Sequence, residues 1–209
     1  MEYSNFRYLF PPRPEVKAPQ TMIKRFEGLG FIAQPKLNGS CGLVFTNGKE
    51  VKFMNRHQGT FSRELINREE LLKLHRGTGW IVLCGEFMNK SQKGADRKVF
   101  NAKFVIFDII VYNGKHLKDS TFWERQSLLD SLYEVQQHDK WINKINESIF
   151  RVKNLEENLE HEWKDIVNVE MYEGFVLKKR EGKLEQSFKQ KNNIGWQVKI
   201  RKSTKNYKY

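Results

Sequence analysis

One lysine in the sequence stands where it could act as a nucleophile. Lys36 lies within residues 35–39 (PKLNG), between two short apolar segments. A lysine side chain attacks phosphorus only as a neutral amine, a form that burial or neighbouring cations favour. Taken alone this run is a weak signal, because a lysine beside a turn is most often a solvated surface residue. The chemistry that it suggests, attack on a phosphate, needs further groups in support.

Further short motifs with the required side chains follow Lys36 along the chain. A phosphorus under attack gathers negative charge on its oxygens, so cations and a divalent metal ion should surround it. Basic residues can supply the cations, and carboxylates can hold the metal ion. The motifs are Asn55-Arg56-His57, Gly85-Glu86, Phe107-Asp108, residues 173–178 (EGFVLK) and residues 196–201 (WQVKIR).

Short strands are expected to carry most of these motifs. Apolar and β-branched runs bounded by turn residues predict strands, and Asn47-Gly48 predicts a hairpin over residues 41–55. Apolar residues at helical spacing predict helices, and Thr121 followed by Glu124 is typical of a helix start. Strands in antiparallel pairs with interspersed helices indicate an α+β fold. The predicted strands are 31–34, 41–46, 50–55, 80–88, 103–112, 174–179 and 195–201, and the predicted helices are 63–75, 121–137 and 155–167.

The order of the motifs resembles the covalent nucleotidyltransferase superfamily, which contains ATP-dependent DNA ligases, RNA ligases and mRNA capping enzymes. The resemblance runs from about Gln34 to Arg201, nearly the whole chain. It implies the ligase adenylylation fold, with antiparallel sheets flanked by helices. It also implies a reaction in which Lys36 is adenylylated by ATP.

The resemblance implies a role for each matched residue. Gln34 would read the edge of adenine, Phe107 would stack on the base, and Arg56 would contact the ribose or a 5′-phosphate. Catalysis would rest on Lys36, Lys199 and Arg201, and Glu86 and Glu173 would hold the divalent metal ion. The implied ATP contacts are Gln34, Lys36, Asn38, Arg56, Glu86, Phe107, Lys178 and Lys199.

The sequence departs from the family pattern around Lys36. Most DNA ligases have Asp where Asn38 stands and Arg where Cys41 stands. Some RNA ligases tolerate Asn there, and several have Ser after the glycine, as at Ser40. Residues 107–115 and 123–129 look more like a DNA ligase. The resemblance therefore implies a ligase that joins a 3′-hydroxyl to a 5′-phosphate, with DNA slightly favoured and RNA the alternative.

One nucleotidyltransferase domain is expected over residues 1–209, because no repeat or low-complexity block divides them. DNA ligases and capping enzymes continue into an oligonucleotide-binding barrel, whereas this sequence ends eight residues after Arg201. We therefore expect no C-terminal barrel, and an accessory nucleic-acid-binding protein could take its place. We also expect no nicotinamide-binding domain, so that the cofactors would be ATP with Mg²⁺ or Mn²⁺. A capping reaction is disfavoured for lack of the barrel.

Net charge points to a polyanionic partner. There are 37 Lys and Arg against 25 Asp and Glu, a formal charge of +12. The last stretch, from residue 178 onward, holds eleven of these cations and two glutamates, with aromatic residues among the cations of its tail. Cations neutralise backbone phosphates and aromatic rings stack on bases. The expected nucleic-acid contacts are Arg56, Lys202, Lys205 and Tyr207.

A membrane partner is not expected, because the longest apolar runs, such as residues 104–112, are far shorter than a spanning helix. Two cysteines, Cys41 and Cys84, make no disulfide framework, which favours a reducing cytoplasm. Residues 10–14 (FPPRP) are expected to form a stiff segment packed across the domain. The rival hypothesis is a nucleic-acid-binding protein that kept the fold and lost the chemistry, which Asn38 and the expected absence of the barrel motivate.

Overall fold

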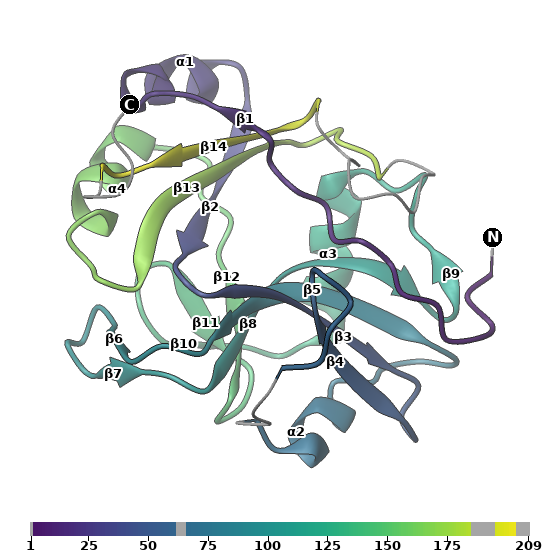
Figure 1. The fold of residues 1–209 in the computed structure, drawn as a ribbon. Helices are drawn as coiled ribbons and strands as arrows, with labels where there is room; N and C mark the ends of the chain where they lie inside the picture. The colour runs from purple at the N-terminus through teal and green to yellow at the C-terminus, as the bar shows by residue number, and fades with distance from the viewer. Residues whose placement is uncertain (1, 62–65, 185–194, 204–209) are drawn as a thin grey trace.

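Two β-sheets with a cavity between them form the frame of the protein. A computed structural model describes residues 2–61, 66–184 and 195–203. In Figure 1 the smaller sheet lies above and to the left of the larger one, and helix α3 lies beside both. Among the described residues, no helix has the length and apolar character needed to cross a membrane.

The smaller sheet contains four strands in the order β1-β14-β13-β2. β1 runs parallel to β14, and the other neighbours are antiparallel. Helices α1 and α4 cover its outer face, where Ala33, Trp163 and Phe175 belong to one buried cluster. The elements are β1 (Val16–Lys17), η1 (Gln20–Met22), α1 (Ile23–Gly28), β2 (Phe31–Leu37), α4 (Leu159–Ile166), β13 (Tyr172–Lys179) and β14 (Gln197–Arg201).

The larger sheet has the order β10-β11-β12-β8-β5-β3-β4, and β9 pairs with β8. β8 runs through its centre and pairs in parallel with β12 and antiparallel with β5. α3 packs against β8, and a separate pair of short strands, β6 and β7, lies off this sheet. The elements are β3 (Ser40–Thr46), β4 (Val51–Asn55), α2 (Arg68–Leu72), β5 (Ile81–Met88), β6 (Gln92–Lys93), β7 (Val99–Phe100), β8 (Lys103–Tyr112), β9 (Lys115–His116), α3 (Phe122–Leu132), β10 (Gln136–Gln137), β11 (Ile142–Lys144) and β12 (Ile149–Val152).

Strands β2 and β14 each have one face in the core and one face on the cavity. Side chains alternate between the two faces of a strand. Ala33 and Leu37 of β2 therefore enter the outer core, whereas Gln34 and Lys36 face the cavity. β14 divides in the same way, with Ile200 in the core and Lys199 on the cavity wall.

The α+β fold with antiparallel pairs and flanking helices is confirmed, and so is the hairpin at Asn47-Gly48, which β3 and β4 form. Thr121 caps α3 with a capping box to Glu124. The predicted helix over residues 121–137 is too long, because α3 ends at Leu132 and residues 136–137 form β10. The helix predicted over 155–167 begins only at Leu159. The start of the helix predicted over 63–75 lies partly outside the described residues, and α2 covers Arg68–Leu72.

Strands β11 and β12 were not predicted. They are only three and four residues long, and neither shows an alternation of polar and apolar residues that would predict a strand. β12 also adds a parallel pair to a sheet that was expected to be antiparallel. Trp196 is buried against Phe122.

Candidate active site

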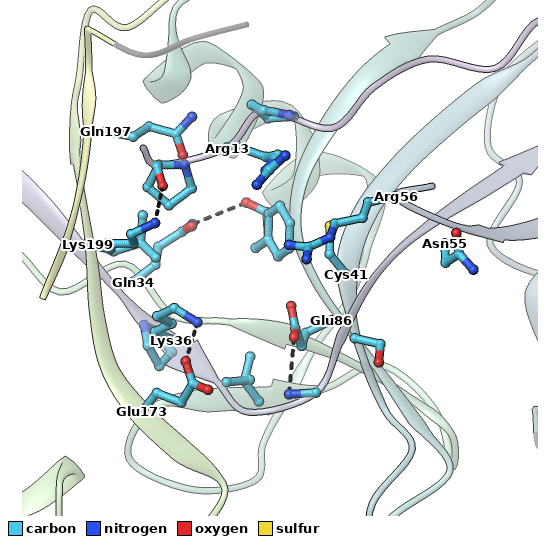
Figure 2. Close-up of a pocket in the computed structure, with 18 of the residues that line it drawn as sticks. Arg13, Gln34, Lys36, Cys41, Asn55, Arg56, Glu86, Glu173, Gln197 and Lys199 are labelled. Atoms are coloured by element: carbon cyan, nitrogen blue, oxygen red, sulfur yellow. Dashed lines mark hydrogen bonds and ion pairs between the residues drawn. The ribbon is translucent and has the colours of Figure 1, made fainter. Parts of the chain in front are cut away.

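A cavity of about 730 Å³ lies between the two sheets. Strands β2, β13 and β14 form one wall, and β3, β5 and β8 with the segment after β4 form the other. Figure 2 shows Lys36, Glu173 and Lys199 on the first wall facing Glu86 and Arg56 on the second. The charged lining residues are Arg13, Lys36, Arg56, Glu86, Glu173, Lys178, Lys199 and Arg201. Six cations against two carboxylates suit an anionic ligand.

Lys36 is held by an ion pair at the end of β2. Its Nζ contacts Glu173 Oε2, and Arg201 Nη2 lies 2.8 Å from the same oxygen. All three side chains are mostly buried, yet each still reaches the cavity. Glu173, which contacts Lys36 in Figure 2, therefore joins the lysine of β2 to the arginine of β14.

A β-bulge turns Glu173 toward the cavity. The register between β13 and β2 shifts between Tyr172 and Gly174. Bulges re-aim side chains, which here adds Glu173 to the face that carries Val176 and Lys178. Gly174 has φ +138°, and a side chain there would overlap the carbonyl oxygen of Ile200. Glycine is therefore required beside Glu173 for this geometry.

Gly39 links the turn after Lys36 to the opposite wall. A Cβ atom at Gly39 would overlap the carbonyl oxygen of Phe87, so only glycine allows this close approach. The backbone N–H of Gly39 donates to Glu86 Oε1 at 3.1 Å. The turn thus positions the carboxylate of β5 against the loop that follows Lys36.

Burial raises the pKa of Glu86 to about 7, and the nearby Glu173 adds to this effect. Lys36 opposes it by favouring the ionised form. The pKa of Lys199 is lowered by burial and by the surrounding cations, among them Lys36 and Arg201. Lys199 Nζ donates to the backbone oxygen of Pro14 at 2.9 Å.

Gln34 contributes a buried amide to the cavity wall. Gln34 is 1% exposed, and its Nε2 donates to Asn154 Oδ1 at 2.8 Å, Gln126 Oε1 at 3.2 Å and Phe107 O at 3.3 Å. Three acceptors around the nitrogen fix the orientation of the amide. Gln34 Oε1 is buried without a hydrogen-bond partner among the described residues. This oxygen can accept a hydrogen bond from the exocyclic amine of adenine.

Lys178 lines the cavity beside Phe107. Its Nζ lies 5.1 Å from the ring centroid of Phe107 and 4.8 Å from that of Phe122. Burial lowers the pKa of Lys178 to about 8, although nearby Asp108 opposes the shift. Asp108 in turn accepts two hydrogen bonds from the buried guanidinium of Arg125, at 2.8 and 3.0 Å. The ion pair connects β8 to α3 directly behind Phe107.

Most of the predicted site residues meet in this one cavity. They are Gln34, Lys36, Arg56, Glu86, Phe107, Glu173, Lys178, Lys199 and Arg201. Arg56 is exposed, with its Nε 3.1 Å from His57 Nε2. Their functional roles stay predictions.

Asn38 and Lys202 do not line the cavity. The backbone N–H of Asn38 donates to Met171 O at 2.9 Å. Lys202 Nζ donates to the carbonyl oxygens of Val167 and Val169, at 3.0 and 3.1 Å. The predicted nucleic-acid contacts Lys205 and Tyr207 lie outside the described residues.

Sequence reasoning missed Arg13 and Gln197, which both line the cavity. Residues 10–14 were expected to be a stiff segment packed across the domain, and Pro12 and Pro14 do line the cavity. The signal for Arg13 was its place between two prolines. For Gln197 it was the alternation of β14, which puts residues 197, 199 and 201 on one face.

The donor set fits a divalent cation held together with a phosphate. No group of three or more His, Cys, Asp or Glu residues that could hold a metal ion occurs in the described part of the chain. Glu86 and Glu173 both line the cavity. Magnesium is commonly bound by one or two carboxylates with substrate phosphates completing its shell. The pair therefore suits a metal ion that arrives with its nucleotide.

Comparison with known proteins adds a family and a fold. A family model described as ATP dependent DNA ligase domain matches residues 76–197. No curated protein gives a significant match to the sequence.

The ligase domain of LigD from M. tuberculosis is similar in structure, with a TM-score of 0.61 and 16% identity over 94% of this chain and 61% of that one. A mycobacterial DNA ligase D complexed with ATP and MES has a TM-score of 0.60 and 17% identity over 94% and 62%. A structure of the Lig E DNA ligases has a TM-score of 0.53 and 12% identity over 95% and 70%. This chain thus spans about three fifths of the first two, and all three share its fold.

Proposed function

This chain belongs to the ATP-dependent DNA ligase domain family, and from that membership we propose a function for its cavity. The protein is a polynucleotide ligase that joins a 3′-hydroxyl to a 5′-phosphate through a lysyl-AMP intermediate, with DNA slightly favoured over RNA. One observation carries the proposal. Lys36 faces a cavity whose other charged groups are five further cations and two glutamates.

In the first step Lys36 Nζ attacks the α-phosphorus of ATP. The new N–P bond forms as the bond from the α-phosphorus to the bridging oxygen breaks, and pyrophosphate leaves with that oxygen. Attack needs the neutral amine, so the ammonium passes one proton to the contacting Glu173 carboxylate or to water, and the nitrogen releases a second proton to water as the N–P bond forms. Arg201 and Lys199 face the charge that develops on the phosphate oxygens.

The second and third steps use the same cavity. An oxygen of the 5′-phosphate attacks the AMP phosphorus, the N–P bond breaks, and the departing Lys36 nitrogen takes up a proton from water. The 3′-hydroxyl then loses its proton to water and attacks the 5′-phosphorus, the bond from that phosphorus to the AMP oxygen breaks, AMP leaves, and a phosphodiester remains. Positioning dominates such reactions, which suits groups fixed on strands.

Gln34 and Phe107 orient the nucleotide in this proposal. The unpartnered Oε1 of Gln34 accepts a hydrogen bond from the adenine amine, a donor that guanine lacks at the same position. Phe107 offers its half-buried ring for stacking on the base, with Lys178 beside it. The roles of these three side chains are consistent with ATP as the nucleotide.

Glu86 and Glu173 would hold Mg²⁺ or Mn²⁺. A bound divalent ion supplies Lewis-acid stabilisation of phosphate charge. The ionised form of Glu86 is the ligand, and its pKa of about 7 makes metal affinity increase as the pH rises through neutrality.

Intact-mass measurement after incubation with ATP and Mg²⁺ tests the proposal. The wild-type protein should gain the mass of one AMP moiety. Lys36→Ala should gain none, whereas Lys24→Ala, on the exposed face of α1, should react like the wild type. A wild-type protein that gains no AMP would contradict the enzymatic function and favour a protein that only binds nucleic acid.

An RNA ligase acting by the same mechanism is the second candidate. Asn38 and Ser40, next to Gly39, favour it. The family model, described as a DNA ligase domain, favours DNA. A sealing assay separates the DNA ligase from the RNA ligase. Its substrates are nicked DNA, nicked RNA and single-stranded RNA, each with a 5′-phosphate, and the substrate that is sealed identifies the function.

Nucleic acid is the proposed partner, and the cytoplasm is the proposed location. Arg56 at the rim of the cavity would contact the strand, and Lys202, Lys205 and Tyr207 would extend that contact along the C-terminal segment. An accessory nucleic-acid-binding protein would increase the affinity for the nucleic acid. If the affinity of the protein for DNA or RNA falls steeply as the salt concentration rises, contacts to backbone phosphates are supported.

A further inference from the structure

Arg13 places a guanidinium in the cavity without a protein partner. The segment before β1 brings Pro12, Arg13 and Pro14 to the cavity wall. Among the described residues, the Arg13 side chain has no hydrogen bond or ion pair. In Figure 2 it lies between Lys199 on one wall and Arg56 on the other.

The chain around Arg13 is stiff and anchored. Pro12 and Pro14 have fixed φ angles, and a residue before proline is restricted to extended backbone. Pro14 accepts the hydrogen bond from Lys199 Nζ, and β1 begins two residues later and pairs with β14. The backbone at Arg13 therefore loses little conformational entropy when the side chain binds a ligand.

Gln197 provides a second unsatisfied donor on the same wall. Its side chain is 1% exposed and lines the cavity, and its Nε2 is buried without a hydrogen-bond partner among the described residues. An unpaired buried donor costs free energy unless a ligand satisfies it. Gln197 is two residues before Lys199 on β14, so both side chains project from the same face.

We propose that Arg13 and Gln197, with Lys199, form a phosphate-binding subsite of this cavity. The inference rests on the proposed function, which supplies two phosphate groups that could occupy it. One is the β- and γ-phosphate pair of ATP, and the other is the 5′-phosphate of the strand to be sealed. Guanidinium and amide N–H groups are donors only, and the planar fork of arginine matches two phosphate oxygens.

Two affinity ratios test the subsite and identify its phosphate. The first is the affinity for ATP over AMP, measured by calorimetry with EDTA present so that no transfer occurs. The second is the affinity for a DNA oligonucleotide with a 5′-phosphate over the same oligonucleotide with a 5′-hydroxyl. Arg13→Gln should lower one of the two ratios by about tenfold, the usual effect of losing a charge-assisted hydrogen bond.

A fall in the first ratio assigns the subsite to the triphosphate, and a fall in the second assigns it to the strand end. Gln197→Leu should lower the same ratio by a smaller factor, and Arg13→Lys should recover part of the loss. Arg25→Gln, which removes an exposed charge on α1, should leave both ratios unchanged.

Two unchanged ratios in Arg13→Gln would overturn the subsite, and so would equal falls in Arg25→Gln. Thermal unfolding of each variant identifies any that fails to fold. If Arg13→Gln does not fold, the two affinity ratios of Arg13→Lys test the subsite instead. The proposed function fails separately. If the wild-type protein forms no AMP adduct but its affinity ratios still depend on Arg13, the phosphate-binding subsite is supported and the ligase function is refuted.

Discussion

The carboxyl group of Glu86 should make the stability of the ligand-free protein depend on pH. Burial raises its pKa from 4.5 to about 7, with a further contribution from Glu173, although Lys36 and the Gly39 N–H act in the opposite direction. One pKa unit corresponds to about 1.36 kcal/mol. The ionised carboxylate is therefore less favourable in the folded protein than in the unfolded chain by about 3 kcal/mol.

The sign follows from proton binding. Between pH 4.5 and about 7 the folded state retains a proton on Glu86 that the unfolded state has lost. The free energy of unfolding therefore falls as the pH rises through this window. Below the window the group contributes no change with pH, and above it the loss is complete.

Urea denaturation of Glu86→Gln measures the effect. The amide keeps an acceptor for the Gly39 N–H but does not ionise. Without nucleotide or metal, the free energy of unfolding of the variant minus that of the wild type should rise by about 3 kcal/mol between about pH 4.5 and pH 8. Glu157→Gln, an exposed control, should show no such rise. A Glu86→Gln difference that stays constant with pH would refute the reasoning.

Three further changes test the frame of the site. Asp108→Asn leaves the buried guanidinium of Arg125 without its counter-charge and should cost about 3–5 kcal/mol in urea denaturation; a loss below about 1 kcal/mol would contradict the importance of this ion pair. Gly39→Ala forces a methyl group against the carbonyl of Phe87 and should cost about 1–3 kcal/mol, and an unchanged melting temperature would show that the turn can move away. Thr121→Ala removes the cap of α3 and should cost about 1 kcal/mol, whereas Thr121→Ser should cost much less.

Strands with continuous apolar runs could be predicted from the sequence. β5 and β8 are buried along nearly their whole length, and their residue types show it. β11 and β12 could not be predicted, because β12 joins the sheet by pairing with β8 across distant sequence and β11 joins it only through β12. The end of α3 was missed for a similar reason, since helical spacing continues to Val135 although the helix ends at Leu132.

The cavity could be predicted in part. The order of the motifs along the chain indicated the family resemblance. The structure places most of the matched side chains around one cavity. The groups that orient them come from elsewhere in the chain. Asn154 is 120 residues from Gln34, and Arg13 reaches the cavity on a proline-containing segment that precedes the first matched motif. Contacts over such distances leave no local pattern of hydropathy or spacing.

Peptide mapping of the protein after reaction with ATP and Mg²⁺ is the most direct test of the central claim. Tandem mass spectrometry should find AMP on the peptide that contains residues 35–39, attached to Lys36, and on no other peptide. AMP attached instead to Lys178 or Lys199, which line the same cavity, would contradict the assignment of the nucleophile.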